Sequence, residues 1–357
     1  MTSYWTTHYG NPASVHYAGR LAARTVATAR KTIADHLGVL PYQLFFNSGA
    51  TEGNNWIFKA FAESKPERRK IVVGAIEHKS VLNAALALKN FGFEVITIPV
   101  TPDGVIDVDV ANRIIDSQTG LVAVQLANNE TGVIQPVATL VASTHEQGAF
   151  FHCDTVQGLG KIPIDLDELG VDSATFSGHK IHGPKGIGIL YLKAGATNFP
   201  FPHPFHGGSQ EQGVRPGTLN VPSIVGLAKA CDMLPEATAM DGMRRLRDHL
   251  EEALKIAVPN CVIHGDLAQR IPNTTNVALP GVASDILIAN LSLFCVSNGS
   301  ACNSASIEPS FVLREMGVTR DEASRSIRVS TSTCTTLDEI DFFVRELNIV
   351  LNKITIK

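Results

Sequence analysis

A lysine at position 180 lies in the stretch Ser177-Gly178-His179-Lys180, and a turn rich in glycine and proline follows it as far as Gly186. Apolar runs stand on both sides of this stretch, so the lysine is expected on a tight loop between two strands. A lysine on such a loop can be desolvated, which lowers its pKa and makes its amine a nucleophile toward carbonyls. Because Ser177 and His179 can hold a phosphate, the pattern favours a Schiff base with pyridoxal phosphate (PLP). The alternative is a surface lysine in a hairpin.

A cysteine at position 302 stands in a second informative segment, Val296 to Ala305, among glycine, serine and asparagine. Such a segment cannot pack into a core and is expected to be mobile. Most single cysteines are buried and inert, but these neighbours favour exposure, so we interpret Cys302 as a reactive thiol. Its neighbour Cys295 follows large apolar residues and is expected to be buried.

Polar motifs also follow several predicted strands. Asn47 to Asn55 joins a strand to a helix, where glycine permits a tight turn and the free N–H groups of the helix N-terminus can bind a phosphate. A simple helix cap explains the same residues. His78 follows a strand ending at Ala75, where it can stack on a flat ring or move protons; a capping histidine is the alternative.

Carboxylate, amide and guanidinium groups mark three further places. Asn128-Asn129-Glu130 can orient a polar substrate or form an Asx turn. Asp154 closes a buried strand and needs a partner. A pyridinium nitrogen would be such a partner and would stay protonated as an electron sink; a buried salt bridge is the alternative. Arg328 lies in a strand-like run and needs an anion, either a substrate carboxylate or a structural Asp or Glu.

Short apolar runs alternate with helical patterns from Gln43 to Phe176. The runs are nearly continuous in apolar residues, as in strands buried on both faces, and their alternation with helices indicates a mainly parallel α/β sheet. In such a sheet ligands bind at the carboxyl ends of the strands, where these motifs fall. The predicted strands are 44–47, 70–75, 94–99, 121–127, 150–154, 173–176 and 188–192, and the predicted helices are 11–37, 51–62, 79–90, 108–116 and 137–147.

The pattern changes after Val221. Helices are predicted at 224–234 and 240–256, and the remainder mixes strands at 276–278 and 327–330 with helices at 285–291 and 337–354. We therefore predict a large domain over residues 1–235 and a smaller C-terminal α+β domain over residues 236–357. The smaller domain carries the mobile cysteine loop at about 296–306.

The composition excludes several classes of function. The chain has 357 residues, of which 44% are hydrophobic and 18% charged, so it can bury a large core in about two domains. A net charge of -4 without a basic run argues against direct nucleic-acid binding. We expect no signal peptide and no membrane span. Six scattered cysteines without C-x-x-C spacing predict free thiols in a reducing cytoplasm, with neither disulfides nor a metal site.

Taken in order, these motifs resemble the cysteine desulfurases of class V of the PLP-dependent aminotransferases, in the NifS/IscS-like group. The resemblance covers essentially the whole chain and implies the PLP-dependent transferase fold-type I. The matched residues are Gly10-Asn11-Pro12-Ala13-Ser14, Ser48-Gly49-Ala50-Thr51-Glu52, Glu77-His78-Lys79, Asn128-Asn129-Glu130, Asp154 with Gln157, Ser177-Gly178-His179-Lys180, Arg215-Pro216-Gly217-Thr218, Ser300-Ala301-Cys302 and Ser326-Ile327-Arg328.

The resemblance implies a role for each matched side chain. Lys180 binds PLP covalently, His78 stacks on its ring and shuttles protons, and Cys302 takes the sulfur as a persulfide while alanine is released. Asn129 and Arg328 bind the carboxylate of the substrate, L-cysteine. The remaining cofactor contacts are made with the ring by Asp154 and Gln157, with the phosphate by Ala50, Thr51, Ser177 and His179, and with the phosphate of the neighbouring subunit by Thr218.

The resemblance also implies a homodimer and a sulfur-acceptor protein. Iron–sulfur cluster assembly, tRNA thiolation and DNA phosphorothioation all use enzymes of this kind, and the residues do not choose among them. A selenocysteine lyase-type class V enzyme and a low-activity sulfur-relay scaffold are the alternatives. Only Met1 to Tyr9 precede the Gly-Asn-Pro motif, whereas family members carry a further segment that lines the substrate entrance. We therefore expect altered closure of the pocket.

Overall fold

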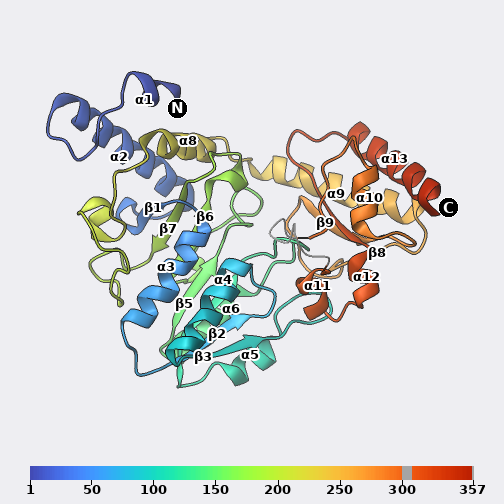
Figure 1. The fold of residues 1–357 in the computed structure, drawn as a ribbon, viewed down its shortest axis with the longest axis horizontal. Helices are drawn as coiled ribbons and strands as arrows, with labels where there is room; N and C mark the ends of the chain where they lie inside the picture. The colour runs from blue at the N-terminus through green and yellow to red at the C-terminus, as the bar shows by residue number, and fades with distance from the viewer. Residues whose placement is uncertain (300–307, 356–357) are drawn as a thin grey trace. The chain divides into compact units, whose positions relative to one another are not determined.

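The computed structural model describes residues 1–299 and 308–355, which belong to two compact units (Figure 1). The first unit comprises Met1–Ile98, Val108–Leu126 and Pro136–Leu234, and the second comprises Pro99–Asp107, Ala127–Gln135 and Pro235–Lys357. Two short segments from the N-terminal half of the chain thus pack with the C-terminal unit. The division into continuous domains 1–235 and 236–357 stays a prediction.

A seven-stranded sheet forms the centre of the first unit. The strands lie in the order β1 (Leu44–Asn47), β7 (Gly188–Leu192), β6 (Ser173–Ser177), β5 (Phe150–Asp154), β4 (Thr119–Gln125), β2 (Lys70–Gly74) and β3 (Glu94–Ile98). The pairs from β6 across to β3 are parallel, whereas β7 is antiparallel to both β6 and β1. The short connection from β6 to β7 explains the antiparallel pair, because a parallel pair needs a crossover of a dozen or more residues. The prediction of a mainly parallel α/β sheet is confirmed.

The burial of the strands follows from their place in the sheet. Six of the seven strands of this sheet are buried almost throughout, but β3 at one edge is exposed at Glu94 and buried only at Ile98. The other edge strand, β1, is covered differently: the backbone N–H of Phe46 donates to Glu211 Oε2 at 2.7 Å, and Arg30 pairs with the same carboxylate. The carboxylate of this ion pair therefore accepts a hydrogen bond from a backbone N–H on the free edge of β1.

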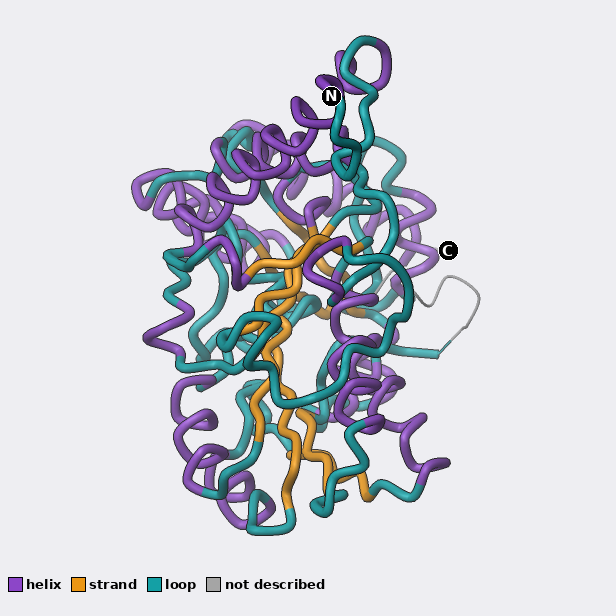
Figure 2. The backbone as a smooth tube through the Cα atoms, turned by 90° about the vertical axis from the view of Figure 1, so that its left-hand side faces the viewer, coloured by secondary structure: helices purple, strands orange, loops and turns teal. Residues whose placement is uncertain are grey.

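Helices lie on both sides of this sheet (Figure 2). The helices of the first unit are α1 (Thr2–Thr6), α2 (Tyr17–Leu37), α3 (Ala50–Glu63), α4 (Lys79–Ala87), α5 (Val108–Ile114), α6 (Val137–Glu146), α7 (Leu166–Leu169) and α8 (Val221–Asp232). Short 3₁₀ turns are η1 (Pro41–Gln43), η2 (Leu88–Phe91), η3 (Gly178–Ile181) and η4 (Gln210–Gly213). The helix predicted from Asn11 begins later, because Asn11 Oδ1 accepts from Ala13 N in a turn and His16 Nδ1 caps the helix at Gly19 N.

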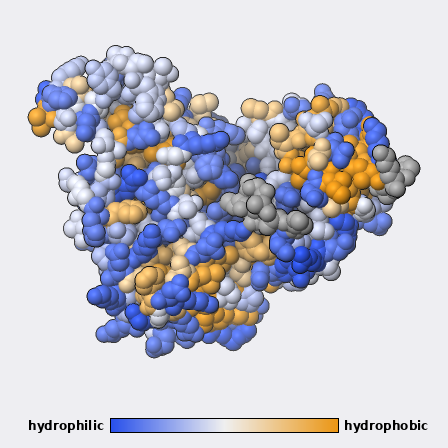
Figure 3. Space-filling view, in the orientation of Figure 1, coloured by the Kyte–Doolittle hydropathy of each residue, from blue (hydrophilic) through white to orange (hydrophobic). Residues whose placement is uncertain are grey.

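The second unit contains a three-stranded antiparallel sheet with helices, as predicted for an α+β fold. Its strands lie in the order β10 (Ser326–Ser330), β9 (Thr274–Ala278) and β8 (Val262–Ile263). Its helices are α9 (Ala237–Ala257), α10 (Ser284–Asn290), α11 (Phe311–Glu315), α12 (Arg320–Ser324) and α13 (Leu337–Thr355). Leu254, Val277 and Leu347 lie in the core of this unit. Apolar side chains, among them the exposed Ile286, also lie on the surface around α10 (Figure 3). Among the described helices, none is long and apolar enough to cross a membrane.

Candidate functional site

The site residues of the first unit gather where the carboxyl ends of several strands of its sheet meet. Asp154 ends β5, Ser177 ends β6, and His78 follows the end of the parallel strand β2. Since β7 is antiparallel to both β1 and β6, β1 runs in the same direction as β6, and the N-terminus of α3 lies at this edge too. The carboxyl ends of four strands thus meet here, where open α/β sheets bind their ligands.

Asp154 is a buried carboxylate whose two oxygens accept hydrogen bonds. Oδ2 accepts from Asn54 Nδ2 at 2.9 Å, and Oδ1 accepts from the backbone N–H of Val156 at 3.1 Å. Burial raises the pKa of Asp154, while the Asn54 hydrogen bond and the charges of His78 and Lys180 lower it. A carboxylate in this environment is stabilised by a cationic N–H partner.

His78 is both the N-cap of α4 and a neighbour of this carboxylate. Its Nδ1 accepts from the backbone N–H of Ser80 at 3.1 Å and lies 2.7 Å from Ser80 Oγ. The capping alternative is thus observed, and Nε2 is the ring nitrogen left to donate. Burial lowers the pKa of His78, Asp154 acts in the opposite direction, and Lys180 lowers it further. The imidazole is therefore neutral near pH 7, with its proton on Nε2.

A second carboxyl group, that of Glu77, lies deeper in the same region. Oε1 accepts from the backbone N–H of Gln125 at 2.9 Å, and the side chain is fully buried. Burial raises the pKa of Glu77 well above its ordinary value, and the charge of Asp154 raises it further. The two carboxyl groups therefore disfavour each other's ionisation, and Asp154 is the one with hydrogen-bond donors on both oxygens.

The start of α3 and the end of β6 form a seat for an anion. Gly49 precedes α3 with φ 145°, a backbone conformation that L side chains rarely adopt, and the helix N-terminus begins at Ala50 and Thr51. A Cβ built on Gly49 would lie 3.5 Å from Ser177 Oγ, so the hydroxyl group faces this N-terminus closely. Ser177 Oγ also lies 2.9 Å from His179 Nδ1. N–H and hydroxyl donors at a helix N-terminus are well suited to a phosphate.

Lys180 follows in η3, and its side chain is exposed. The protein alone does not desolvate this amine, in contrast to the sequence-based expectation. Its charge nevertheless acts on both Asp154 and His78. An amine, a phosphate seat and a buried carboxylate for a pyridinium nitrogen are the donor set that PLP requires, so these residues fit the cofactor.

Gln157 and Thr218 are two further residues that the sequence predicts to contact the cofactor. Gln157 is half-buried, and its Oε1 accepts from Lys161 Nζ at 2.5 Å. Because its carbonyl oxygen is occupied, the amide presents its N–H₂ group as a donor to an oxygen acceptor. Thr218 is exposed.

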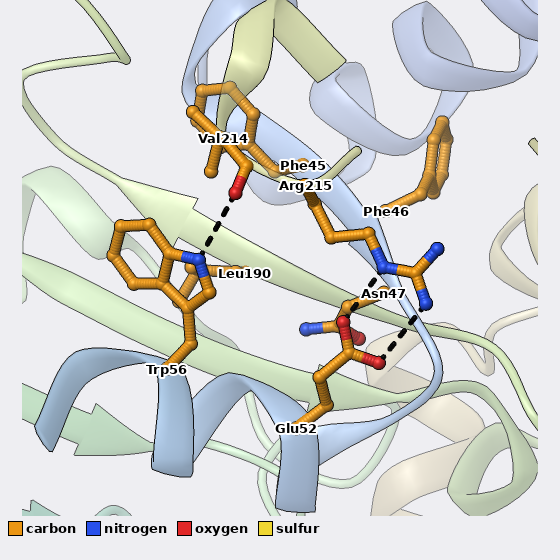
Figure 4. Close-up of a pocket in the computed structure, with 8 residues that line it drawn as sticks. All are labelled: Phe45, Phe46, Asn47, Glu52, Trp56, Leu190, Val214 and Arg215. Atoms are coloured by element: carbon orange, nitrogen blue, oxygen red, sulfur yellow. Dashed lines mark hydrogen bonds and ion pairs between the residues drawn. The ribbon is translucent and has the colours of Figure 1, made fainter. Parts of the chain in front are cut away.

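The segment that leads to Thr218 is fixed to α3 at two points (Figure 4). Arg215 Nε donates to Glu52 Oε1 at 2.8 Å, and Trp56 Nε1 donates to the carbonyl of Val214 at 3.2 Å. The small cavity between them, of about 10 Å³, has room for one water at most. Burial raises the pKa of Glu52, but the hydrogen bonds from Arg215 and Ser48 hold it below its ordinary value.

Two predicted substrate-binding residues lie together in the second unit. Arg328 Nη1 donates to the backbone carbonyl of Asn129 at 2.7 Å. Asn128 Oδ1 accepts from the backbone N–H groups of Glu130 and Thr131 at 2.8 and 2.9 Å, so the Asx-turn alternative is also present. Burial lowers the pKa of Arg328, and the charge of Glu130 acts in the opposite direction. Within the described residues no carboxylate forms an ion pair with Arg328, so its structural anion is not found.

Cysteine positions agree only in part with the sequence predictions. Cys302 lies outside the described residues. Cys295 is exposed, so the prediction that it is buried is wrong: the apolar residues before it do not cover it, and Leu293 is itself 69% exposed. The five cysteines that the structure describes are unpaired, and no group of metal-ligating side chains occurs in that part of the chain.

Asn54 is a site residue that the sequence interpretation overlooked, although it stands inside the Asn47–Asn55 motif. It is fully buried and contacts Asp154 directly. A signal was present: Asn54 precedes Ile57, Phe58 and Phe61 by three, four and seven positions, which places a polar side chain on the apolar stripe of α3.

Comparisons with known proteins show which family this chain resembles. The aminotransferase class-V family model matches residues 1–343. A cysteine desulfurase from Nostoc sp. is 41% identical over 342 residues, covering 95% of this chain and 85% of that protein. The cysteine desulfurase IscS of Rickettsia bellii is 40% identical and covers 99% of this chain and 87% of its own length. Among solved structures, a NifS-like protein aligns with a TM-score of 0.91 at 37% identity, over 99% of this chain and 94% of that one.

Proposed function

Because the chain belongs to the aminotransferase class-V family and, within it, to the cysteine desulfurases, we propose the residue roles by which it removes sulfur from L-cysteine. The enzyme is a PLP-dependent cysteine desulfurase, and its organic product is L-alanine. One observation carries the assignment of roles: Asp154 is a buried carboxylate that ends β5 at the carboxyl end of the sheet and accepts a hydrogen bond from Asn54 at 2.9 Å.

The cofactor would be held by the first unit. Lys180 Nζ would bind it covalently, Asp154 would pair with the ring nitrogen, and Gln157 would donate its amide N–H to the ring hydroxyl. His78 would contact the ring. Ala50, Thr51, Ser177 and His179 would bind the phosphate. Bound PLP supplies an electron sink for the carbon skeleton of the substrate.

The substrate carboxylate is bound by Arg328 and Asn129. The half-buried position of Arg328 supports this role, because a partly desolvated cation without an ion-pair partner among the described residues gains from an incoming anion. The hydrogen bond from Arg328 Nη1 to the Asn129 carbonyl supports it further, since it orients the guanidinium and leaves its other N–H groups to be directed at a substrate.

Proton transfer is assigned to His78. Its imidazole is neutral with the proton on Nε2, so this nitrogen can donate a proton to the substrate carbon or sulfur and take one back. The Ser80 N–H and Oγ groups hold Nδ1 and thereby keep the ring in that state.

The sulfur-transfer step is assigned to Cys302. Its thiolate attacks the sulfur atom of the substrate, a new S–S bond forms, and the C–S bond breaks. The electron pair of the broken bond stays on the carbon, which is then protonated to give alanine. The sulfur remains on Cys302 as a persulfide, so no external oxidant or reductant is needed. A sulfur-acceptor protein would remove it in turn.

A homodimer in the cytoplasm completes the proposal. Thr218 would reach the phosphate of the neighbouring subunit, and its exposure together with the fixed Val214–Arg215 segment supports that role. A reducing compartment is supported by the unpaired state of the five described cysteines.

Alanine formation from L-cysteine tests these roles. Wild-type enzyme should release alanine and sulfide in the presence of a thiol, and Cys302→Ser should lose sulfide release while the visible absorbance of the bound cofactor stays. Lys180→Ala should lose both the release of sulfide and the visible absorbance of the cofactor. Full activity of Cys302→Ser would refute the role of Cys302 as the nucleophile. A Lys180→Ala protein that is coloured and active would refute the role of Lys180 as the cofactor-binding lysine. Selenocysteine and cysteine sulfinate serve as comparison substrates.

A further inference from the structure

A buried hydrogen-bond network surrounds the amide of Asn54. Oδ1 lies 2.9 Å from His152 Nε2 and accepts from Thr175 Oγ1 at 2.7 Å. Nδ2 donates to Ser80 Oγ at 2.8 Å and to Asp154 Oδ2 at 2.9 Å. All four partners are at most 8% exposed, and Asn54 itself is fully buried.

The direction of these hydrogen bonds follows from the donors available. His152 is fully buried and neutral, and Asn54 Oδ1 can only accept, so His152 donates through Nε2. Asp154 sets the orientation of the Asn54 amide, because a carboxylate can only accept, so Nδ2 meets Asp154 and Oδ1 meets His152 and Thr175. Ser80 Oγ accepts from Asn54, which leaves the Ser80 proton for His78 Nδ1 at 2.7 Å.

Asn54 therefore holds both groups that would meet the cofactor ring. One N–H of its amide meets Asp154, and the other reaches His78 through Ser80. We propose that Asn54 is a positioning residue for the cofactor: it keeps Asp154 ionised and oriented toward the ring nitrogen, and it fixes the imidazole of His78. This inference rests on the ring contacts proposed above for Asp154 and His78.

The decisive variant is Asn54→Asp, which keeps the size of the side chain and its acceptor toward His152 and Thr175. It replaces the N–H that meets Asp154 with a carboxylate oxygen, so two carboxylates would meet at about 2.9 Å and share a proton. Asn112→Asp is the matched control. It adds the same charge on an exposed side chain of α5 and keeps the oxygen that accepts from Ser143 Oγ.

The measurements are made on the holoenzyme. The first is the rate at which PLP leaves the protein on gel filtration, and the second is the pH dependence of the cofactor's visible absorbance. We expect Asn54→Asp to release PLP at least about 10-fold faster and to shift the absorbance titration, since a charge-assisted hydrogen bond is lost. Asn112→Asp should match the wild type in both measurements. Wild-type release and absorbance in Asn54→Asp, or equal damage in Asn112→Asp, would overturn the proposal.

Two further variants separate the possible failures. Asp154→Ala tests the underlying assignment: if it leaves PLP release and absorbance unchanged, the proposed role of Asp154 fails, whereas damage in Asp154→Ala with none in Asn54→Asp defeats only the role of Asn54. Ser80→Ala cuts the branch to His78 and keeps the branch to Asp154. It should lower kcat at least about 5-fold while PLP release stays within about 2-fold of the wild type. If Asn54→Asp does not fold, Ser80→Ala decides alone, and an unchanged kcat then overturns the proposal.

Discussion

Because of His152, the free energy of unfolding of the protein should fall as the pH falls, and a single substitution of this residue should abolish that contribution. The imidazole is fully buried between two partners: Nε2 donates to Asn54 Oδ1 at 2.9 Å, and Nδ1 lies 2.8 Å from Ser173 Oγ. Burial lowers the pKa of His152 from 6.5 to about 3, although a hydrogen bond from the ring to the Ser173 backbone acts in the opposite direction. The perturbation that tests this is His152→Gln, which keeps an N–H donor and removes the titrating ring.

The sign follows from the order of the two pKa values. The folded pKa of His152 lies below the unfolded one, so on acidification the unfolded chain takes up a proton before the folded protein does. The stabilising effect of the neutral ring is complete above pH 6.5 and is lost as the pH falls toward 3. Because a tenfold change in proton affinity corresponds to about 1.4 kcal/mol, the full loss is about 5 kcal/mol. About 2 kcal/mol of it falls between pH 7 and pH 5.

Urea unfolding of the cofactor-free chain at pH 7 and pH 5 provides the assay. Fluorescence of Trp56, which is 2% exposed, reports on the first unit. The difference in free energy of unfolding between wild type and His152→Gln should change by about 2 kcal/mol between the two pH values. Ser173→Ala keeps the buried ring and should retain the wild-type pH dependence. A difference between wild type and His152→Gln that is the same at both pH values would refute the buried neutral imidazole.

Two stability predictions use neighbouring or like positions as controls, each measured by urea unfolding. A Cβ on Gly53 would lie 2.5 Å from a methyl carbon of the facing β6 threonine, so Gly53→Ala should destabilise the protein by about 1–3 kcal/mol. The control Gly242→Ala in α9 meets nothing closer than 3.9 Å and should stabilise the protein by up to about 1 kcal/mol. The opposite order of stabilities would contradict the packing. Arg30→Met leaves the Glu211 carboxylate, 1% exposed, without its cation and should lower the free energy of unfolding by about 3–5 kcal/mol. The control Lys31→Met breaks an ion pair exposed at both ends and should lower it by under about 0.5 kcal/mol. Equal losses would refute the stabilising role of the buried pair at the edge of β1.

The alternation of apolar runs and helical patterns was sufficient to predict the large sheet, because each strand of a parallel sheet is buried on both faces and is followed by a covering helix. The same rule failed at β3, which the sequence pattern treats like the other strands but which is largely exposed at the edge of the sheet. Strand order depends on pairings between distant segments, and a local pattern contains no information about which strand ends at an edge.

The candidate site was predictable where a motif stands at the end of a strand, as at Asp154 and Ser177. Asn54 was not predicted, because its importance depends on the fold bringing four partners from α4, β5 and β6 around one amide. The prediction for Cys295 failed for a similar reason: apolar neighbours in sequence do not ensure cover in space, as exposed Leu293 shows.

In the proposed reaction this chain moves the sulfur of L-cysteine onto Cys302. Intact-mass spectrometry measures this transfer after incubation of the holoenzyme with L-cysteine, without a reductant or an acceptor. We expect a gain of one sulfur atom per chain, reversed by a thiol reductant, with one equivalent of alanine formed and no gain in Cys302→Ser. Alanine formation without any added sulfur on the wild-type chain, or an equal gain in Cys302→Ser, would contradict it.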